Sequence, residues 1–171
     1  MKRLNKTRQV RVPLRYLPTR LTKKDRKRQI QMLLKSRKSY KKHQYYNREK
    51  VSSYNHKVSS HILDARKIYH IDNIRPSKEL SKVTGCSISA LKQIVKKGEG
   101  AYYSSGSRPN QSAQSWGLAR LASSITSGKA AAVDYSIIEK GCDHSKKAFR
   151  LATKSKKMYN HGQSRTKKVF I

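Results

Sequence analysis

Two short helices joined at a glycine are predicted by one stretch of the sequence, Leu80-Ser81-Lys82-Val83-Thr84-Gly85-Cys86-Ser87-Ile88-Ser89-Ala90-Leu91-Lys92-Gln93-Ile94. Its apolar positions are spaced as in a helix-turn-helix, a motif whose second helix lies in the major groove of DNA. Gly85 suits the turn, and Ser87 can cap the second helix. An ordinary helical hairpin explains the same pattern, and Thr84 stands where the DNA-binding motif usually has an apolar residue.

Both interpretations of the hairpin stay open on sequence grounds. If the second helix faces a major groove, polar side chains on its outer side contact the nucleic acid. The predicted contact residues are Ser87, Ser89, Lys92, Gln93 and Lys96.

Helical periodicity continues on both sides of the hairpin, and no segment is predicted to be a paired strand. We therefore expect an all-α fold whose small body has about five short helices, the hairpin included. Gly98 is expected to end the second helix of the hairpin, and a loop rich in glycine and serine to follow over 98–112. The helices expected in the body cover residues 60–71, 76–84, 88–98, 113–126 and 130–140.

The charge distribution divides the chain into three parts. Residues 1–50 hold 19 basic and two acidic residues, residues 144–171 hold nine basic residues and no acidic one, and residues 51–143 carry the near-ordinary balance of 13 to seven. We predict a basic N-terminal arm with one charged helix at 23–40, a helical body, and a basic C-terminal helix and tail. Only 35% of the residues are apolar, whereas about 45–50% is usual, so a large core is excluded.

The N-terminal arm is expected to be extended, because Pro13 and Pro18 forbid a helix there. The flank is too charged to bury its own apolar side chains, which are therefore expected to dock on a partner, with backbone pairing along a sheet edge of that partner. The apolar residues of this tether are Val10, Val12, Leu14 and Tyr16. The basic residues expected to pair with carboxylates of the partner are Arg11, Arg15 and Arg20.

The sequence predicts no catalytic residue, cofactor, metal site or small-molecule substrate. Only nine carboxylates are present, and they are scattered. Cys86 and Cys142 form no metal-binding or disulfide framework, so we expect reduced thiols. Cys142 lies close to His144, which permits a nucleophile or a metal ligand. The ordinary interpretation is a cysteine packed at a helix junction, with Asp143 capping a helix over about 144–157.

A second stretch resembles a known family. The segment Arg108-Pro109-Asn110-Gln111, followed by Trp116-Gly117 and by Gly128-Lys129-Ala130, is similar to basic proteins of nucleocytoplasmic large DNA viruses, with relatives in tailed phages. The resemblance covers about 15–152, and the family has no established catalytic site to transfer. In physical terms Asn110 or Ser112 can cap the following helix, and Trp116 and Arg120, four residues apart, can stack. The motif residues of interest are Arg108, Asn110, Trp116 and Arg120.

The resemblance implies a viral chain and, most simply, a particle component. We expect a non-enzymatic minor capsid protein on the inner side of an icosahedral capsid, synthesised in the host cytoplasm, with the major and other minor capsid proteins as partners. The alternative is a DNA-binding protein of the virion or the infected cell that uses the helix-turn-helix and the basic flanks. The sequence leaves open which acidic partner neutralises the basic flanks. The candidates are anionic inner-membrane lipid, viral DNA and acidic protein.

Overall fold

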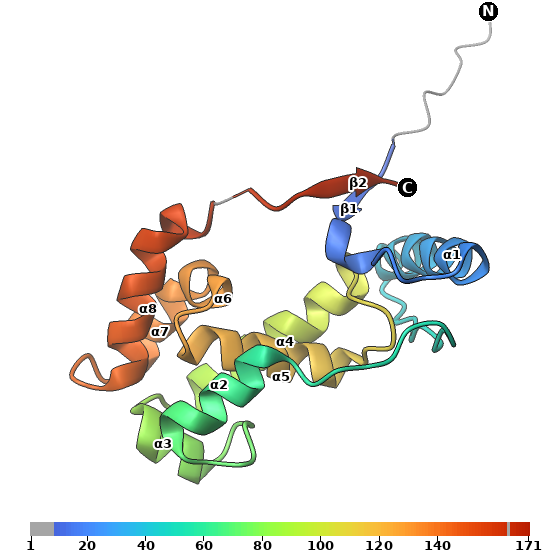
Figure 1. Ribbon diagram of the computed structural model, residues 1–171. Coiled ribbons are helices and arrows are strands. Elements are labelled where there is room, and N and C mark those ends of the chain that lie inside the picture. Colours follow the sequence, from blue (N-terminus) through green and yellow to red (C-terminus); the bar gives the residue numbers. More distant parts are fainter. Residues whose placement is uncertain (1–8, 164) are drawn as a thin grey trace, which may run out of the picture.

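The computed structural model describes residues 9–163 and 165–171, and it is mostly helical, as predicted. Its described part contains more helices than the sequence predicts, and it adds a small two-stranded sheet (Figure 1). None of the helices in these ranges has the length and apolar character needed to cross a membrane. The elements are β1 Arg11–Pro13, η1 Leu14–Tyr16 (a 3-10 turn), α1 Lys23–Tyr40, α2 Ser60–Tyr69, α3 Lys78–Thr84, α4 Ile88–Ser104, α5 Ala113–Ile125, α6 Lys129–Val133, α7 Tyr135–Gly141, α8 Lys147–Met158, η2 Asn160–Gly162 and β2 Lys168–Phe170.

The central helix pair is α4 and α5, which lie against each other at two glycines. A Cβ atom added to Gly98 would lie 2.6 Å from the Cα atom of Gly117. Gly98 is therefore needed for close helix approach, and the prediction that it ends α4 is wrong. The helix continues to Ser104, and only residues 105–112 of the predicted loop connect α4 to α5.

The main core is built from α2 to α8 around this pair. Ala148 and Ala152 of α8 are fully buried in it, so the C-terminal helix packs on the helical body. The helix predicted over 130–140 is divided at Asp134, whose side chain is buried. The buried core residues are Ala65, Tyr69, Ile71, Ile74, Leu80, Cys86, Ala90, Leu91, Ile94, Leu121, Ala122, Ile125, Ala131, Ile137, Ile138, Cys142, Ala148 and Ala152.

The predicted hairpin is present as α3 and α4. Gly85 has the left-handed conformation, with φ 73°, and the side chain of Ser87 accepts a hydrogen bond from the Ala90 amide at the start of α4. Thr84, which departs from the DNA-binding pattern, is buried and donates to the Leu80 carbonyl at 2.6 Å. The hydroxyl of Thr84 thereby has a hydrogen-bond partner within α3, so a threonine at this usually apolar position is compatible with the hairpin.

The turn of the hairpin is joined to the connection between α7 and α8. Cys86 and Cys142 form a disulfide, so the prediction of reduced thiols is wrong. Two backbone hydrogen bonds of 2.8 Å, Ser87 N–H to the Gly141 carbonyl and Asp143 N–H to the Gly85 carbonyl, bring the cysteines together. This pairing depends on tertiary contacts between residues 56 positions apart, which spacing along the chain does not reveal.

The connection also corrects two predictions about its neighbours. His144 stacks on Phe149, with ring centroids 3.9 Å apart, and Cys142 is in the disulfide, so the pair offers no thiol nucleophile. Asp143 does not cap α8. Its carboxylate accepts hydrogen bonds from Ser145, and the helix begins at Lys147 with Lys146 as its N-cap.

The N-terminal arm is paired with the chain's own C-terminus. Strands β1 and β2 are antiparallel, with Val12 opposite Val169 (Figure 1). Val12, Tyr16 and Leu17 are buried against Leu33 of α1, so the expectation that the chain cannot bury these side chains is wrong for them. The prediction failed because α1 and the C-terminal strand together supply the missing apolar surface. Residues 1–8 of the predicted arm lie outside the described part.

Candidate functional site

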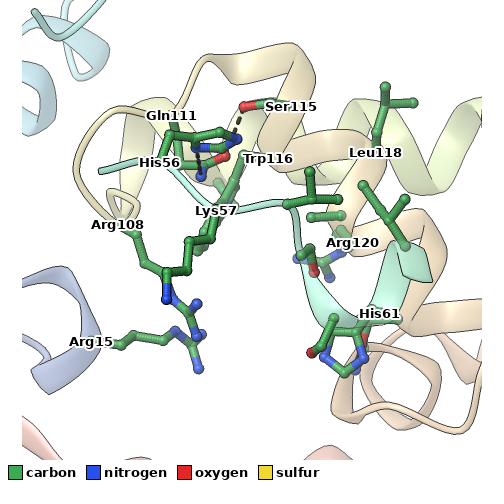
Figure 2. Close-up of a pocket in the computed structure, with 18 of the residues that line it drawn as sticks. Arg15, His56, Lys57, His61, Arg108, Gln111, Ser115, Trp116, Leu118 and Arg120 are labelled. Atoms are coloured by element: carbon green, nitrogen blue, oxygen red, sulfur yellow. Dashed lines mark hydrogen bonds between the residues drawn. The ribbon is translucent and has the colours of Figure 1, made fainter. Parts of the chain in front are cut away.

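A large cleft lies between segments that are far apart in the sequence. Its volume is about 710 Å³. One wall is formed by 15–20 near β1, a second by 54–66 leading into α2, and the others by α5 and the start of α6 (Figure 2). Thr166 adds a contribution from the C-terminal segment. The cleft is thus built by tertiary structure and has no single motif in the sequence.

The lining of the cleft is basic and contains no aspartate or glutamate among the described residues. Seven lysine and arginine side chains and two histidines contribute to it. They are Arg15, Arg20, Lys57, Arg66, Arg108, Arg120 and Lys129, with His56 and His61. A cleft lined by basic side chains and no carboxylates attracts anions, because its low-dielectric walls concentrate the positive electrostatic field.

Two lining groups have lowered pKa values, for which burial is the main cause and neighbouring cations a further one. Burial lowers the pKa of His61, and the charges of Arg108 and Arg15 lower it further, against the opposing effect of Asp64. Burial also lowers the pKa of Lys129, with Arg15 and Lys168 acting in the same direction. Figure 2 shows the side chains of Arg15 and Arg108 reaching toward each other. A bound anion would relieve the repulsion between them.

The loop that carries the Arg-Pro-Asn-Gln motif is held by side-chain hydrogen bonds. Asn110 has a φ of 59°, and its amide oxygen accepts from the Val51 amide at 2.7 Å, while its amide nitrogen donates to the carbonyls of Val51 and Tyr54. Asn110 therefore clamps the segment that forms one cleft wall. Of the two residues expected to cap α5, Ser112 performs this role, in a reciprocal capping box with Ser115.

Gln111 joins the motif loop to the segment that leads into α2. Its Nε2 donates to Nδ1 of His56 at 2.9 Å, and its Oε1 accepts from the Ser115 hydroxyl at 2.7 Å (Figure 2). These bonds fix the loop and His56 relative to the first turn of α5. The motif therefore positions the cleft wall as well as contributing Arg108 to it.

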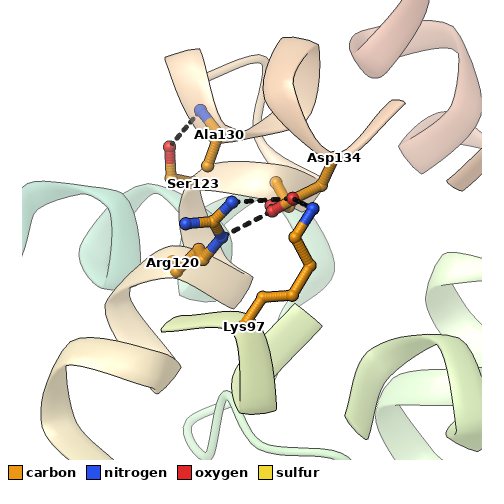
Figure 3. Close-up of polar contacts among 6 residues, drawn as sticks. Lys97, Arg120, Ser123, Ala130 and Asp134 are labelled. Atoms are coloured by element: carbon orange, nitrogen blue, oxygen red, sulfur yellow. Dashed lines mark hydrogen bonds and ion pairs between the residues drawn. The ribbon is translucent and has the colours of Figure 1, made fainter. Parts of the chain in front are cut away.

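Trp116 and Arg120 lie on the α5 face of the cleft but form separate contacts. Trp116 meets Tyr16 edge to face, with ring centroids 5.9 Å apart. Arg120 does not form the predicted stack on Trp116, because its guanidinium donates to both carboxylate oxygens of Asp134, at 2.7 and 2.8 Å (Figure 3). Lys97 reaches the same carboxylate at 2.7 Å.

The buried carboxylate of Asp134 is kept charged by these partners. Burial alone would raise its pKa, but the hydrogen bonds and charge of Arg120, followed by those of Lys97, outweigh burial and lower it. Arg120 is therefore a cleft cation that is already neutralised, and Arg15 and Arg108 are not ion-paired within the described residues.

The residues predicted as a tether divide between the core and the cleft. Arg15 and Arg20 line the cleft, whereas Arg11 lies over the Phe170 ring at 4.7 Å. Val12 and Tyr16 are buried, Val10 is half-buried, and Leu14 is exposed. Lys57, His61 and Lys129 are cleft residues that were not predicted. Lys129 lies in the segment that resembles the viral proteins, and this resemblance could have identified it as a candidate. No local pattern in the sequence distinguishes Lys57.

The predicted nucleic-acid contacts on the hairpin form a second surface. All five side chains are exposed, and none of them lines the large cleft. Three of them, with Lys140 of α7, surround a smaller depression at the start of α4. These residues of the hairpin are Ser87, Ser89 and Gln93. Within the described ranges, no group of three or more histidine, cysteine, aspartate or glutamate side chains is arranged to hold a metal ion.

Comparison with known proteins yields one match. No curated protein and no solved structure is significantly similar to the chain. Residues 13–147 match the model of DUF5824, described as a family of unknown function, and this range contains all the lining residues of the cleft except Thr166. Because the match covers most of the sequence, the chain belongs to the DUF5824 family.

Proposed function

We propose that the protein binds nucleic acid, without catalysing a reaction, through the basic cleft and the basic surface around it. The observation that carries this proposal is the cleft lining, in which seven lysine and arginine residues gather without a carboxylate. Nucleic acid presents a regular series of phosphate charges, and basic side chains that neutralise them release counterions. The chain supplies such side chains in excess, with 41 basic residues against nine acidic ones.

The aromatic side chains of the cleft favour nucleic acid over the carboxylates of an acidic protein. Arginine presents a planar fork that binds phosphate or carboxylate through two hydrogen bonds, so the cations alone do not distinguish the two. Aromatic residues also line the cleft, namely Tyr16, Tyr54 and Trp116. Aromatic rings next to cations are typical of sites that receive bases as well as phosphates.

A second candidate function is the reading of duplex DNA by the hairpin. It is favoured by the agreement between the hairpin geometry and the predicted contacts: Gly85 forms the turn, and the polar side chains of the second helix are exposed. Lys92 and Gln93 would then meet base edges in the major groove. This surface acts separately from the cleft, so the two functions are testable independently.

A position in a virus particle stays a prediction from the resemblance to viral proteins. A nucleic-acid-binding protein on the inner side of a capsid would satisfy both that prediction and the cleft. The buried positions of Val12 and Tyr16 and the pairing of β2 with β1 leave less of the N-terminal arm available as a tether.

The proposal is tested by competition between polyanions on the purified full-length protein. Fluorescently labelled DNA is bound at salt concentrations from about 50 to 200 mM, and polyglutamate or vesicles containing anionic lipid are added at equal charge. We expect DNA to remain bound when polyglutamate or the vesicles are added at equal charge. Displacement by polyglutamate or by vesicles at equal charge would overturn the proposal in favour of acidic protein or lipid.

A further inference from the structure

We infer that the cleft holds single-stranded nucleic acid, with a backbone phosphate between the guanidinium groups of Arg15 and Arg108 and a base beside Trp116. This inference rests on the proposed function and adds two things to it: the strand state of the ligand and the position of one phosphate. It concerns the cleft alone and makes no use of the hairpin surface.

The size of the cleft favours a single strand over a duplex. Its volume of about 710 Å³ lies within the range of about 300–1,000 Å³ in which small-molecule sites are found. A duplex has a major groove that is itself about 12 Å wide, and its bases are stacked inside the helix. A duplex therefore cannot enter such a site, whereas an unstacked strand can place a nucleotide in it.

The position of the phosphate follows from Arg15 and Arg108. The two residues come from different walls, and Figure 2 shows their side chains converging. Neither has an ion pair among the described residues, and both are exposed on the cleft side, where their charges act on the same lining histidine, His61. A phosphate between two guanidinium groups accepts charge-assisted hydrogen bonds from each.

The motif loop holds the backbone beside Arg108 in place before any ligand binds. Asn110 clamps the loop to Val51 and Tyr54, and Ser112 and Ser115 cap α5 directly after it. Pro109, the neighbour of Arg108, is buried. A preorganised backbone reduces the entropy that is lost when the ligand binds. The motif thus has a structural role that also serves phosphate binding.

Trp116 provides both a stacking surface and an optical signal. It is the single tryptophan of the chain, it lines the cleft, and it is half-buried. Bases stack on aromatic side chains with little regard to sequence. Intrinsic tryptophan fluorescence of the full-length protein therefore reports on the cleft alone.

The experiment titrates an oligothymidine strand, and a duplex of the same length, into the full-length protein while tryptophan fluorescence and anisotropy are recorded. The variants are Arg15→Gln and Arg108→Gln, and the matched control is Arg150→Gln, an exposed position on α8 with the same change of charge. We expect each cleft variant to weaken strand binding about tenfold or more, and the control to weaken it about twofold at most. Arg108→Lys should recover part of the loss because it keeps the charge.

Four results separate the possible outcomes. Quenching of Trp116 by the strand and not by the duplex, with a selective loss in Arg108→Gln, supports the inference. Binding of both nucleic acids with unchanged fluorescence, and equal losses in Arg108→Gln and Arg150→Gln, overturns the inference but leaves the proposed function standing. If inorganic phosphate saturates the quenching at a lower concentration than the strand, the site is one for free phosphate, and the inference is overturned. Absence of binding to any nucleic acid at low salt overturns the proposed function itself.

Discussion

Arg120 on α5 donates two hydrogen bonds to Asp134, at the junction of α6 and α7, and the Asp134 side chain is completely shielded from solvent. The ion pair therefore connects the wall of the cleft to the elements behind it. Lys97 of α4 completes the arrangement, so three helical segments meet at one carboxylate. The pair thus neutralises one cation of the cleft lining and holds this wall of the cleft in place.

The first prediction concerns the loss of this anchor. Asp134→Ala should lower the free energy of unfolding by about 1.5–3 kcal/mol, because it removes the charge-assisted hydrogen bonds that the half-buried guanidinium of Arg120 donates to a buried carboxylate. The measurement is urea denaturation followed by circular dichroism. Glu139→Ala, which removes an exposed carboxylate on α7, is the control and should change stability by about 0.5 kcal/mol or less. Equal effects of the two substitutions would contradict the anchoring role.

The second prediction is the pH dependence of the same interaction. The pKa of Asp134 is lower in the folded chain than its ordinary value, so the contribution of the ion pair is complete above the unfolded pKa of about 3.9 and is lost as the pH falls through the lower folded pKa. The difference in unfolding free energy between the wild type and Asp134→Asn should therefore shrink as the solution is acidified below pH 4. The lowered pKa values of Asp25 and Asp143 act in both proteins and cancel in this difference. A pH-independent difference would contradict the prediction.

The third prediction uses two glycines of α4 with different surroundings. Gly98→Ala should destabilise the fold by about 1–3 kcal/mol, because the new methyl group would collide with the backbone of Gly117 and force α4 and α5 apart. Gly100→Ala should be neutral or stabilising by up to about 1 kcal/mol, because its Cβ would lie 4.0 Å from its nearest neighbour, the Tyr40 hydroxyl, and alanine has the higher helix propensity. Thermal unfolding of the two variants provides the comparison. Similar changes in both would show that Gly98 is not required for helix contact.

Local features of the fold are readily predicted from the sequence. The helix expected at 23–40 is observed over the same residues, since Thr22 caps it by accepting from the Asp25 amide. The hairpin turn at Gly85 is likewise set by neighbouring residues. In both places the decisive interactions join residues a few positions apart, and these interactions leave a pattern in the chain.

The remaining features depend on contacts between distant residues. Gly98 resembles a helix end until Gly117 is placed against it, and Cys86 resembles a free thiol until Cys142 is placed beside it. The cleft is the extreme case, because Arg15, Lys57 and Arg108 line it from three segments that are joined by tertiary contacts such as the hydrogen bond between Asn110 and Val51. The sequence indicated a basic protein with a distinctive motif, and the fold shows that the motif organises the basic cleft.

The fourth prediction concerns the pairing of the two termini. Val12→Ala should lower the free energy of unfolding by about 1–2 kcal/mol, because Val12 is fully buried opposite Val169 and the substitution removes two buried methyl groups. Leu14→Ala, at a position that is 42% exposed, is the control and should have an effect within about 0.5 kcal/mol. Hydrogen exchange at two amides reports the pairing, since Leu14 N–H donates to the Lys167 carbonyl and Ile171 N–H donates to the Val10 carbonyl. Faster exchange at both amides in Val12→Ala alone is the expected result, and equal protection in both variants would argue against the pairing.

The last prediction separates the hairpin from the cleft. If the second helix of the hairpin reads bases, replacing Lys92 and Gln93 with alanine should relax the sequence preference for duplex DNA, with a loss of about 1–3 kcal/mol for each good base contact. Both side chains are exposed and lie outside the cleft lining, so binding of a single strand should change only through the lost charge of Lys92. Arg108→Gln should have the opposite profile, weakening the strand while leaving the duplex preference intact. Selection of duplexes from a random pool, followed by affinity measurements on both variants, tests the pair of expectations. If the wild type shows no preference among duplex sequences, the hairpin is structural, and Cys86, Leu91 and Ile94 then account for its pattern by their burial in the core.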